Sequence, residues 1–508
     1  MRRPCGRTRL LPILAIPLLL PALVAALPAA SAREAARAVP PGGALWLDGI
    51  SDVVTGERLD LELTRFEVLA PEARVVVHDD GGARNLPPPV TLFFRGRIAG
   101  EPGSRAVLAL HETGDFRGLA LASGELRLLG HGSPEAAATG RLEARRVEAI
   151  ELATRRPFRC ELEGLGAAGI ELPGSATHLP ASEALLPEAP GYTAVYAVEA
   201  DYEFYQLFDD ATAATDYIVD LVAFLSMLYD DEIGTTIRLG TVHLRTTASD
   251  PWTQTNSLCA LYEFGRYWNN NYGAVSRTAA LMLSGKGSGG GVAWLSVLCD
   301  GAFSYNRGTC TGLNPAVDLY GGAYAFVGSM NGGFDLWDPR VVWDILATAH
   351  EVGHNFSSPH THCYAGLEGN ANQIDFCYTS QCSGSNCSAD TCLGSGSSAH
   401  WQTTNCACPM GTSRLPGVGS TSGGTGGQGV GTIMSYCHLL SPGYSNVSLN
   451  FGTGHTYGIA AGRVASKMSS YVVATAAAPG CLDYVAGGAV FVDGFETGNT
   501  NRWGGDQP

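Results

Sequence analysis

Three histidines and a glutamate in one short run have the types and spacing of a metal-dependent catalytic site. His350 and His354 are four residues apart, so on a helix both imidazoles point from one face toward a single metal ion. Glu351 follows the first histidine, where its carboxylate can hydrogen-bond a water at the metal without binding the metal itself. Pro359 cannot continue a helix, so the chain turns there and can bring His360 back as a third ligand. Three imidazoles leave one position of a zinc ion open for water, which is typical of catalytic sites.

The competing interpretation of this run is a pair of surface histidines on an ordinary helix. A bare H-E-x-x-H pattern also arises by chance, but a third histidine at this offset makes a metal site the better hypothesis. Two other residues are alternative third ligands. They are His362, just downstream, and Glu368, which would serve in a different type of zinc site. Met434, in the run 431–436, would by itself be a core residue. Together with the long histidine motif, it predicts a tight turn beneath the metal ligands.

The site residues need a helix to carry them and a sheet to support that helix. Asp338 and Pro339 have the pattern of a helix cap and a first-turn proline. Apolar residues at helical spacing continue from there into the histidine run, which predicts one buried stripe. Upstream, strand and helix patterns are mixed, which predicts an α/β sandwich with a core of its own. The expected strands cover residues 192–199, 236–245, 279–284 and 292–298, and the expected helices cover 210–228 and 257–272.

The rest of the chain divides into four parts. Residues 1–32 contain four arginines among the first nine residues, then an apolar stretch and small residues, which is typical of a cleaved signal peptide. Residues 33–160 alternate apolar and polar side chains, which predicts a small antiparallel β domain. Residues 161–190 are rich in Gly, Ala, Pro and Glu and have the composition of an exposed linker that is open to cleavage. Residues 476–508 form a C-terminal tail of unassigned role.

Composition excludes several classes of partner. The chain has 508 residues, enough for two or three domains, and a net charge of −16 with no basic run, so we expect neither nucleic acid nor an anionic membrane surface as a partner. Beyond the signal peptide we expect no membrane span in the mature form.

Fourteen cysteines in an exported chain predict disulfides rather than a metal–thiolate cluster. We expect most of these bonds to brace the loops around the histidine site, notably the insert between His360 and Met434.

With the long histidine motif and Met434 in place, the sequence resembles the metzincin zinc metalloproteases, and within them the reprolysin (ADAM-like) group in a bacterial secreted form. The resemblance implies a metzincin-type α/β (α+β) catalytic domain over 191–475, with a twisted mixed sheet and an active-site helix. It also implies one catalytic Zn²⁺ and a small β-rich prodomain over 33–160. Ser357 departs from the pattern, because the family usually has glycine there to allow unusual backbone angles. Serine can adopt them at a cost of roughly 1 kcal/mol.

Two further parts of the site take their roles from the resemblance. Tyr436 lies two residues after Met434, where reprolysins of animal type usually have proline and the astacin and serralysin branches have tyrosine. That likeness implies that Tyr436 stabilises the oxyanion, and the alternative is a packed aromatic side chain held by its neighbour Cys437. The run Val292-Ala293-Trp294-Leu295 is similar to the edge strand above the active-site cleft. An extended peptide substrate would pair with such a strand by β-augmentation.

The resemblance also bears on how the enzyme is kept inactive before cleavage and on whether it binds calcium. Segments 93–104 and 116–119 look like parts of a reprolysin propeptide. In related proteases a propeptide thiolate occupies the open zinc position and keeps the zymogen silent, which is the hypothesis for Cys160. A plain disulfide is the alternative for this cysteine. Calcium is not supported, because Val195 stands where the adamalysin calcium site has a glutamate.

These observations together predict a secreted, monomeric zinc metalloendopeptidase (EC 3.4.24 class) that hydrolyses protein or peptide substrates. One alternative is a non-catalytic secreted adhesion or binding module that keeps zinc for structure. Another is a zinc hydrolase that acts on non-peptide substrates. Glu351 favours catalysis, since a purely structural site has little use for a general base beside an open zinc position. The propeptide-like region favours proteolysis, because latency protects the producing cell.

Overall fold

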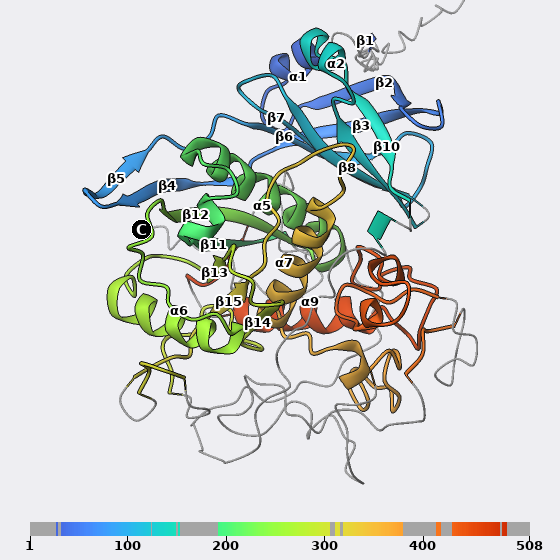
Figure 1. Cartoon of the computed structure of the whole chain (residues 1–508). Helices are drawn as coiled ribbons and strands as arrows, with labels where there is room; N and C mark the ends of the chain where they lie inside the picture. The colour runs from blue at the N-terminus through green and yellow to red at the C-terminus, as the bar shows by residue number, and fades with distance from the viewer. Residues whose placement is uncertain are drawn as a thin grey trace, which may run out of the picture.

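The computed structural model describes residues 27–28, 32–122, 124–148, 151–152, 191–304, 310–314, 318–378, 413–417, 429–477 and 480–484. These residues form an N-terminal barrel and a second sheet flanked by helices, with the barrel at the top of Figure 1. Several predictions fall outside the described residues: Cys160, the linker over 161–190, and nearly all of the signal peptide and the tail.

The N-terminal barrel has seven strands in the order β2-β10-β9-β8-β7-β6-β3, and β3 pairs with β2 to close the ring. Neighbouring strands of the ring are antiparallel except β2 and β10, which are parallel. The sequence predicted strands here but not closure, because closure depends on pairing between the first and last strands of the region. The elements of this part are β1 (Leu27–Pro28), α1 (Ala32–Ala38), β2 (Ala44–Asp52), β3 (Arg58–Phe66), β6 (Leu92–Ile98), β7 (Arg105–Leu110), β8 (Phe116–Ala122), β9 (Glu125–Gly130), α2 (Pro134–Thr139) and β10 (Glu143–Arg146).

A hairpin leaves the barrel between β3 and β6 and joins the second sheet. Strand β4 (Leu69–Asp79) pairs in parallel with β12 (Thr235–Arg245), and β5 (Gly82–Leu86) pairs antiparallel with β4. Val75 and Val77 are buried on one side of β4. Both valines lie within 33–160, where a separate antiparallel β domain was expected. Alternation of apolar residues predicts a strand but does not say which sheet the strand enters.

The second sheet has the order β14-β15-β13-β11-β12-β4-β5. Its strands are parallel except for β14 and β5 at the two edges, each antiparallel to its neighbour. A short strand, β16, pairs with β11 beside this path. The predicted mixed α/β arrangement is confirmed. The elements are β11 (Tyr192–Ala200), α4 (Tyr202–Tyr205), α5 (Ala211–Ile233), α6 (Ser257–Asn271), β13 (Ala279–Leu283), β14 (Gly291–Ala293), β15 (Tyr324–Val327), α7 (Val341–Asn355), η3 (Thr361–Cys363), η5 (Cys437–Leu439), η6 (Tyr444–Asn446), α9 (Arg463–Ala476) and β16 (Asp483–Tyr484).

Helix α5 connects the two parts of the structure. It packs against β12, against α7 and against β7 of the barrel. Asp210, the first residue of the helix expected over 210–228, caps its N-terminus by accepting a hydrogen bond from the backbone N–H of Ala213 at 2.8 Å. Helix α5 is long and apolar enough to cross a membrane, although no such segment was expected beyond the signal peptide. In the structure, 78% of its most apolar window is buried inside the protein, as expected for a core helix.

Candidate active site

Helix α7 carries the first three residues of the site and is buried along its whole length. The predicted cap at Asp338 is wrong, because the helix begins at Val341 and the Asp338 carboxylate instead accepts a hydrogen bond from the Arg340 side chain at 2.7 Å. Asp344, in the first turn of the helix, accepts a hydrogen bond from the hydroxyl of Tyr217 on α5 at 2.6 Å. This buried contact fixes α7 against α5. This contact could not be predicted from the sequence, because Asp344 interrupts an apolar stripe and belongs to no motif.

The three predicted histidine ligands meet at one point. Their ligand nitrogens all lie within 4.8 Å of one another, and Nε2 of His360 is 3.1 Å from Nε2 of His350. His350 and His354 come from the last two turns of α7. The chain then turns through Ser357, whose φ is 77°, and brings His360 next to the two helix histidines. This nitrogen cluster fits a single zinc ion, which takes imidazole ligands at about 2.0–2.1 Å.

Hydrogen bonds and burial prepare these imidazoles for a metal. Nδ1 of His350 donates to the carbonyl of Ile433 at 2.7 Å, and Nδ1 of His354 donates to the carbonyl of Ser358 at 2.7 Å. These bonds fix the tautomer that leaves Nε2 available as a ligand. Burial lowers the pKa of all three rings, to about 4 for His354 and well below the usual value for His350 and His360. The rings are therefore neutral near pH 7, which is the form that binds zinc.

Met434 lies directly against the middle of the histidine motif. Its backbone carbonyl accepts a hydrogen bond from the N–H of Thr361 at 3.0 Å, next to His360. A Cβ atom placed on Gly353 would lie 2.4 Å from the Met434 sulfur, closer than any real contact. Gly353 is thus the residue that lets Met434 approach the helix. The sequence alone shows a glycine inside a helix but does not reveal what it contacts.

We expect Gly353→Ala to lower the melting temperature, because overpacking in a core costs about 1–3 kcal/mol. In a Met434→Ala background the same change should be neutral or stabilising. The sulfur is then gone, and alanine favours a helix over glycine by about 1 kcal/mol. Thermal unfolding of the wild type, both single variants and the double variant measures this difference. Equal destabilisation by Gly353→Ala in both backgrounds would contradict the contact.

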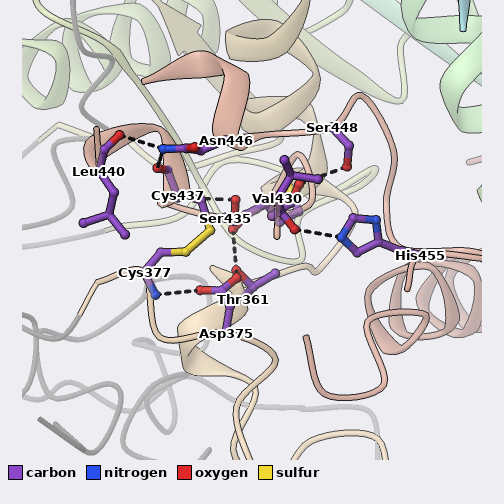
Figure 2. Close-up of a disulfide and its surroundings, with 12 residues drawn as sticks. Thr361, Asp375, Cys377, Val430, Ser435, Cys437, Leu440, Asn446, Ser448 and His455 are labelled. Atoms are coloured by element: carbon purple, nitrogen blue, oxygen red, sulfur yellow. Dashed lines mark hydrogen bonds between the residues drawn. A yellow bond between two sulfur atoms is a disulfide. The ribbon is translucent and has the colours of Figure 1, made fainter. Parts of the chain in front are cut away.

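A disulfide ties the insert after the histidines to the segment after Met434. Cys377 is bonded to Cys437, as Figure 2 shows. The carboxylate of Asp375, two residues before Cys377, accepts hydrogen bonds from the backbone N–H of Cys377 at 3.1 Å and from the hydroxyl of Thr361. The prediction of disulfides is confirmed, and this bond braces the insert as expected. Two further bonds lie among the described residues, Cys259–Cys310 and Cys299–Cys481.

The predicted edge strand is shorter than expected. Only Val292 and Ala293 of the four predicted residues lie in β14, and the chain turns away at Ser296, where φ is 59°. The segment after β14 is then hydrogen-bonded to the end of α7. The amide Nδ2 of Asn355 donates to the carbonyl of Trp294 at 2.9 Å, and the backbone N–H of Ser296 donates to the carbonyl of His354 at 3.0 Å. Asn355 therefore holds the edge strand beside the histidines, although no sequence pattern singled it out.

Glu351 lies under the edge strand. The side chain is fully buried, and a Cβ atom on Gly291 would lie 2.6 Å from its Oε1 atom. The carboxylate thus packs against the backbone of β14 at the one position where no side chain intervenes. Gly291 is a second glycine whose role the sequence did not show, although the run 289–291 of three glycines was a usable signal.

Ser357 has the left-handed backbone that was expected at the position where the family usually has glycine. Its φ is 77°, and its Oγ atom accepts a hydrogen bond from the hydroxyl of Ser296 at 2.8 Å. Ser296 is itself in a left-handed conformation. The serine thus adds a side-chain link between the histidine turn and the segment after β14, which a glycine could not make.

Ser357→Gly should change the free energy of unfolding by less than about 1 kcal/mol. Relief of strain, roughly 1 kcal/mol, is offset by loss of a hydrogen bond worth about as much. The matched variant Ser357→Val should destabilise by about 2 kcal/mol or more, because a branched residue both keeps the strain and loses the bond. Denaturant unfolding of the three proteins measures both values. A valine variant as stable as the glycine variant would contradict this account.

The remaining predicted residues lie around the ligands. The ring of Tyr436 is buried with its centroid 4.2 Å from that of His360, so it packs against the third ligand. The ring of His362 stacks on His360 at 5.4 Å, but its nitrogens are not in the three-histidine group. Glu368 accepts a hydrogen bond from Ser466 on α9 at 3.4 Å and is not in that group either. Among the described residues, His360 therefore has the best geometry for the third ligand.

Comparison with known families agrees with this geometry. A family model described as metallo-peptidase family M12, of the reprolysin type, matches residues 192–448, just over half of the chain. The match runs from β11 through α7 and the three histidines to the segment beyond Met434. A comparison with curated proteins found no match. The chain therefore belongs to metallo-peptidase family M12, as a reprolysin-type metzincin.

Proposed function

We propose that this chain is a secreted zinc-dependent endopeptidase that hydrolyses protein or peptide substrates with Glu351 as the general base. One observation carries the proposal: His350, His354 and His360 converge at one point, and Glu351, the residue after the first of them on α7, packs its buried carboxylate against edge strand β14. Metallopeptidases of this family use zinc, and the three-histidine group fits one ion. The three disulfides among the described residues support export to an oxidising compartment.

Each part of the proposed site has a separate role in peptide hydrolysis. His350, His354 and His360 would hold a zinc ion, which would supply a Lewis acid for the scissile carbonyl and lower the pKa of a water molecule. Glu351 takes the proton of the attacking water and then delivers a proton to the leaving amine. Tyr436, from its place against His360, is proposed to donate a hydrogen bond to the developing oxyanion. Strand β14 is proposed to hold an extended substrate peptide by β-augmentation, which places the scissile bond above Glu351.

Digestion of casein by the processed protein, with and without 1,10-phenanthroline, tests this function. We expect the chelator to abolish cleavage and added Zn²⁺ to restore it. Tight zinc binding without cleavage of casein or of a mixed peptide library would contradict a peptidase and favour a binding module. Hydrolysis of a non-peptide ester, with no cleavage of peptides, would favour the second alternative.

A further inference from the structure

We propose that the N-terminal barrel stays bound to the catalytic domain after the linker between them is cut, so that the processed protein is a two-chain complex. The surface formed by β12 and α5 would then stay covered by the barrel and by the β4–β5 hairpin, which belong to the same chain. Three independent sets of contacts support this inference. None of them depends on the enzymatic activity proposed above.

The first set is the hairpin that completes the catalytic sheet. Strand β4 follows β12 in parallel register from Arg74 opposite Thr241 to His78 opposite Arg245. Beyond this run, the backbone N–H of Thr246 donates to the carbonyl of His78 at 3.0 Å. Without β4, strand β12 would become an open sheet edge with unpaired backbone groups. The hairpin is covalently part of the barrel, between β3 and β6, so it cannot stay unless the barrel stays.

The second set is a hydrophobic core shared by the two parts. Barrel strands carry buried apolar residues on both faces. Residues that are adjacent in sequence belong to two different hydrophobic clusters, one inside the barrel and one shared with the catalytic domain. Phe94 and Leu108 belong to the barrel interior. Phe93 and Val107, their neighbours in sequence, belong instead to the core of the catalytic domain, together with residues of α5. A barrel released from this core would expose a broad apolar face, which soluble monomers rarely do. The other barrel residues in this shared core include Ala109, Leu119, Leu126, Leu128 and Val147.

The third set is a row of ion pairs between barrel arginines and carboxylates of α5. Arg117 on β8 lies 2.9 Å from the Asp220 carboxylate, which is only 1% exposed. The other oxygen of the same carboxylate lies 3.1 Å from the ring of His111. Removing the barrel would leave Asp220 without these two cationic partners. Two further barrel arginines pair with the C-terminal end of α5: Arg95 with Asp230 at 3.0 Å, and Arg105 with Asp231 at 2.6 Å and Glu232 at 2.7 Å.

The bound barrel is compatible with an open active site. Besides β12 and α5, it contacts the segment before α7, where the indole N–H of Trp337 donates to the carbonyl of Gly132 at 2.8 Å and Arg145 donates to the carbonyl of Leu336 at 3.1 Å. Strand β14, under which Glu351 lies, forms the opposite edge of the sheet from β4 and β5. The described part of the barrel therefore contacts the segment before α7 and the β4–β5 side of the sheet, opposite the edge proposed to bind substrate.

The test uses the full chain with a site for a sequence-specific protease inserted between residues 161 and 190. After complete cleavage at that site, size-exclusion chromatography in physiological salt should show both pieces eluting together, at the volume of the uncut chain. Separate elution of the barrel, or its precipitation after cleavage, would overturn the proposal. Because the readout is size, an inactive protein leaves the proposal testable, and loss of the complex does not bear on activity.

Charge reversal identifies the contacts that hold the complex. Arg117→Glu should speed dissociation by about a hundredfold, because it places a like charge against buried Asp220. The matched control is Arg97→Glu, since Arg97 is on the same barrel but pairs with Glu62 inside it. Equal dissociation rates for the two variants would overturn the assigned surface.

Raising the pH provides a second measurement of the contacts between the barrel and α5. Burial would lower the pKa of His111, but Asp220 and Asp216 outweigh burial and Arg117, and raise the pKa to about 9. The charged ring stabilises the complex fully below its ordinary pKa, and this contribution is lost as the pH rises through 9. Thr91, 3.3 Å from the ring, and Arg37 and Glu112, which line a cavity with it, are the other nearby polar groups. Dissociation should thus accelerate as the pH rises from about 6.5 to about 9 in the wild type but not in His111→Gln. The same pH dependence in both proteins would count against this contact.

Discussion

Replacing Glu351 with glutamine should lower kcat for peptide hydrolysis by about 10²–10⁴-fold while zinc binding stays intact. The size of the loss follows from general acid–base catalysis, because glutamine cannot take a proton from the attacking water or return one to the amine. Zinc binding should survive because the ligands are the three histidines and Glu351 is not among them. The variant preserves side-chain volume, which matters since the carboxylate packs against the backbone at Gly291.

Steady-state kinetics on a defined peptide, with zinc content measured on the same samples, checks this result. Glu368→Gln is the matched control, because Glu368 is a nearby carboxylate that contacts Ser466 instead of the histidine cluster. It should retain wild-type kcat and zinc content. A Glu351→Gln enzyme as active as wild type would disprove the role of Glu351.

Replacing His360 with alanine should weaken zinc binding by more than about a hundredfold and abolish activity at limiting zinc. Loss of a hydrogen bond that supports a ligand already costs 10–100-fold in metal affinity, and loss of the ligand itself costs more. The geometric reason is the 3.1 Å separation between Nε2 of His360 and Nε2 of His350, which places both nitrogens at one ion.

His362→Ala is the control for that experiment. His362 is two residues away and its ring stacks on His360, so both variants remove an imidazole from the same short segment. Competition with a chromogenic chelator measures the two zinc affinities. The account expects near-wild-type affinity for His362→Ala. The reverse order of affinities would assign the third ligand to His362.

The candidate site could be predicted from the sequence where local spacing determines geometry. His350, Glu351 and His354 lie within two turns of one helix, and Pro359, which cannot continue a helix, predicted a turn before His360. Four residues could therefore be placed without any tertiary information. The same is true of helix α5, whose cap at Asp210 is a local signal. Long helices with apolar periodicity are the elements that sequence patterns identify best.

What could not be predicted depends on contacts between distant segments. The valines of β4 alternate in the same way whether the strand stays in the barrel or pairs with β12, so alternation alone could not predict the shared sheet. The end of β14 was misplaced because the left-handed turn at Ser296 is set by bonds to the end of α7. Gly291 and Gly353 make room for Glu351 and Met434, respectively, and a close approach of this kind is invisible until both partners are placed.

The most direct test of the central claim is a zinc titration of the metal-free processed protein, followed by the rate of peptide cleavage. The account predicts a rate that rises linearly with zinc and levels off at one equivalent per chain, because one group of three histidines binds one ion. The Glu351→Gln protein should bind the same equivalent and stay inactive. Peptide cleavage by the metal-free protein, or a rate that does not respond to zinc, would contradict the account.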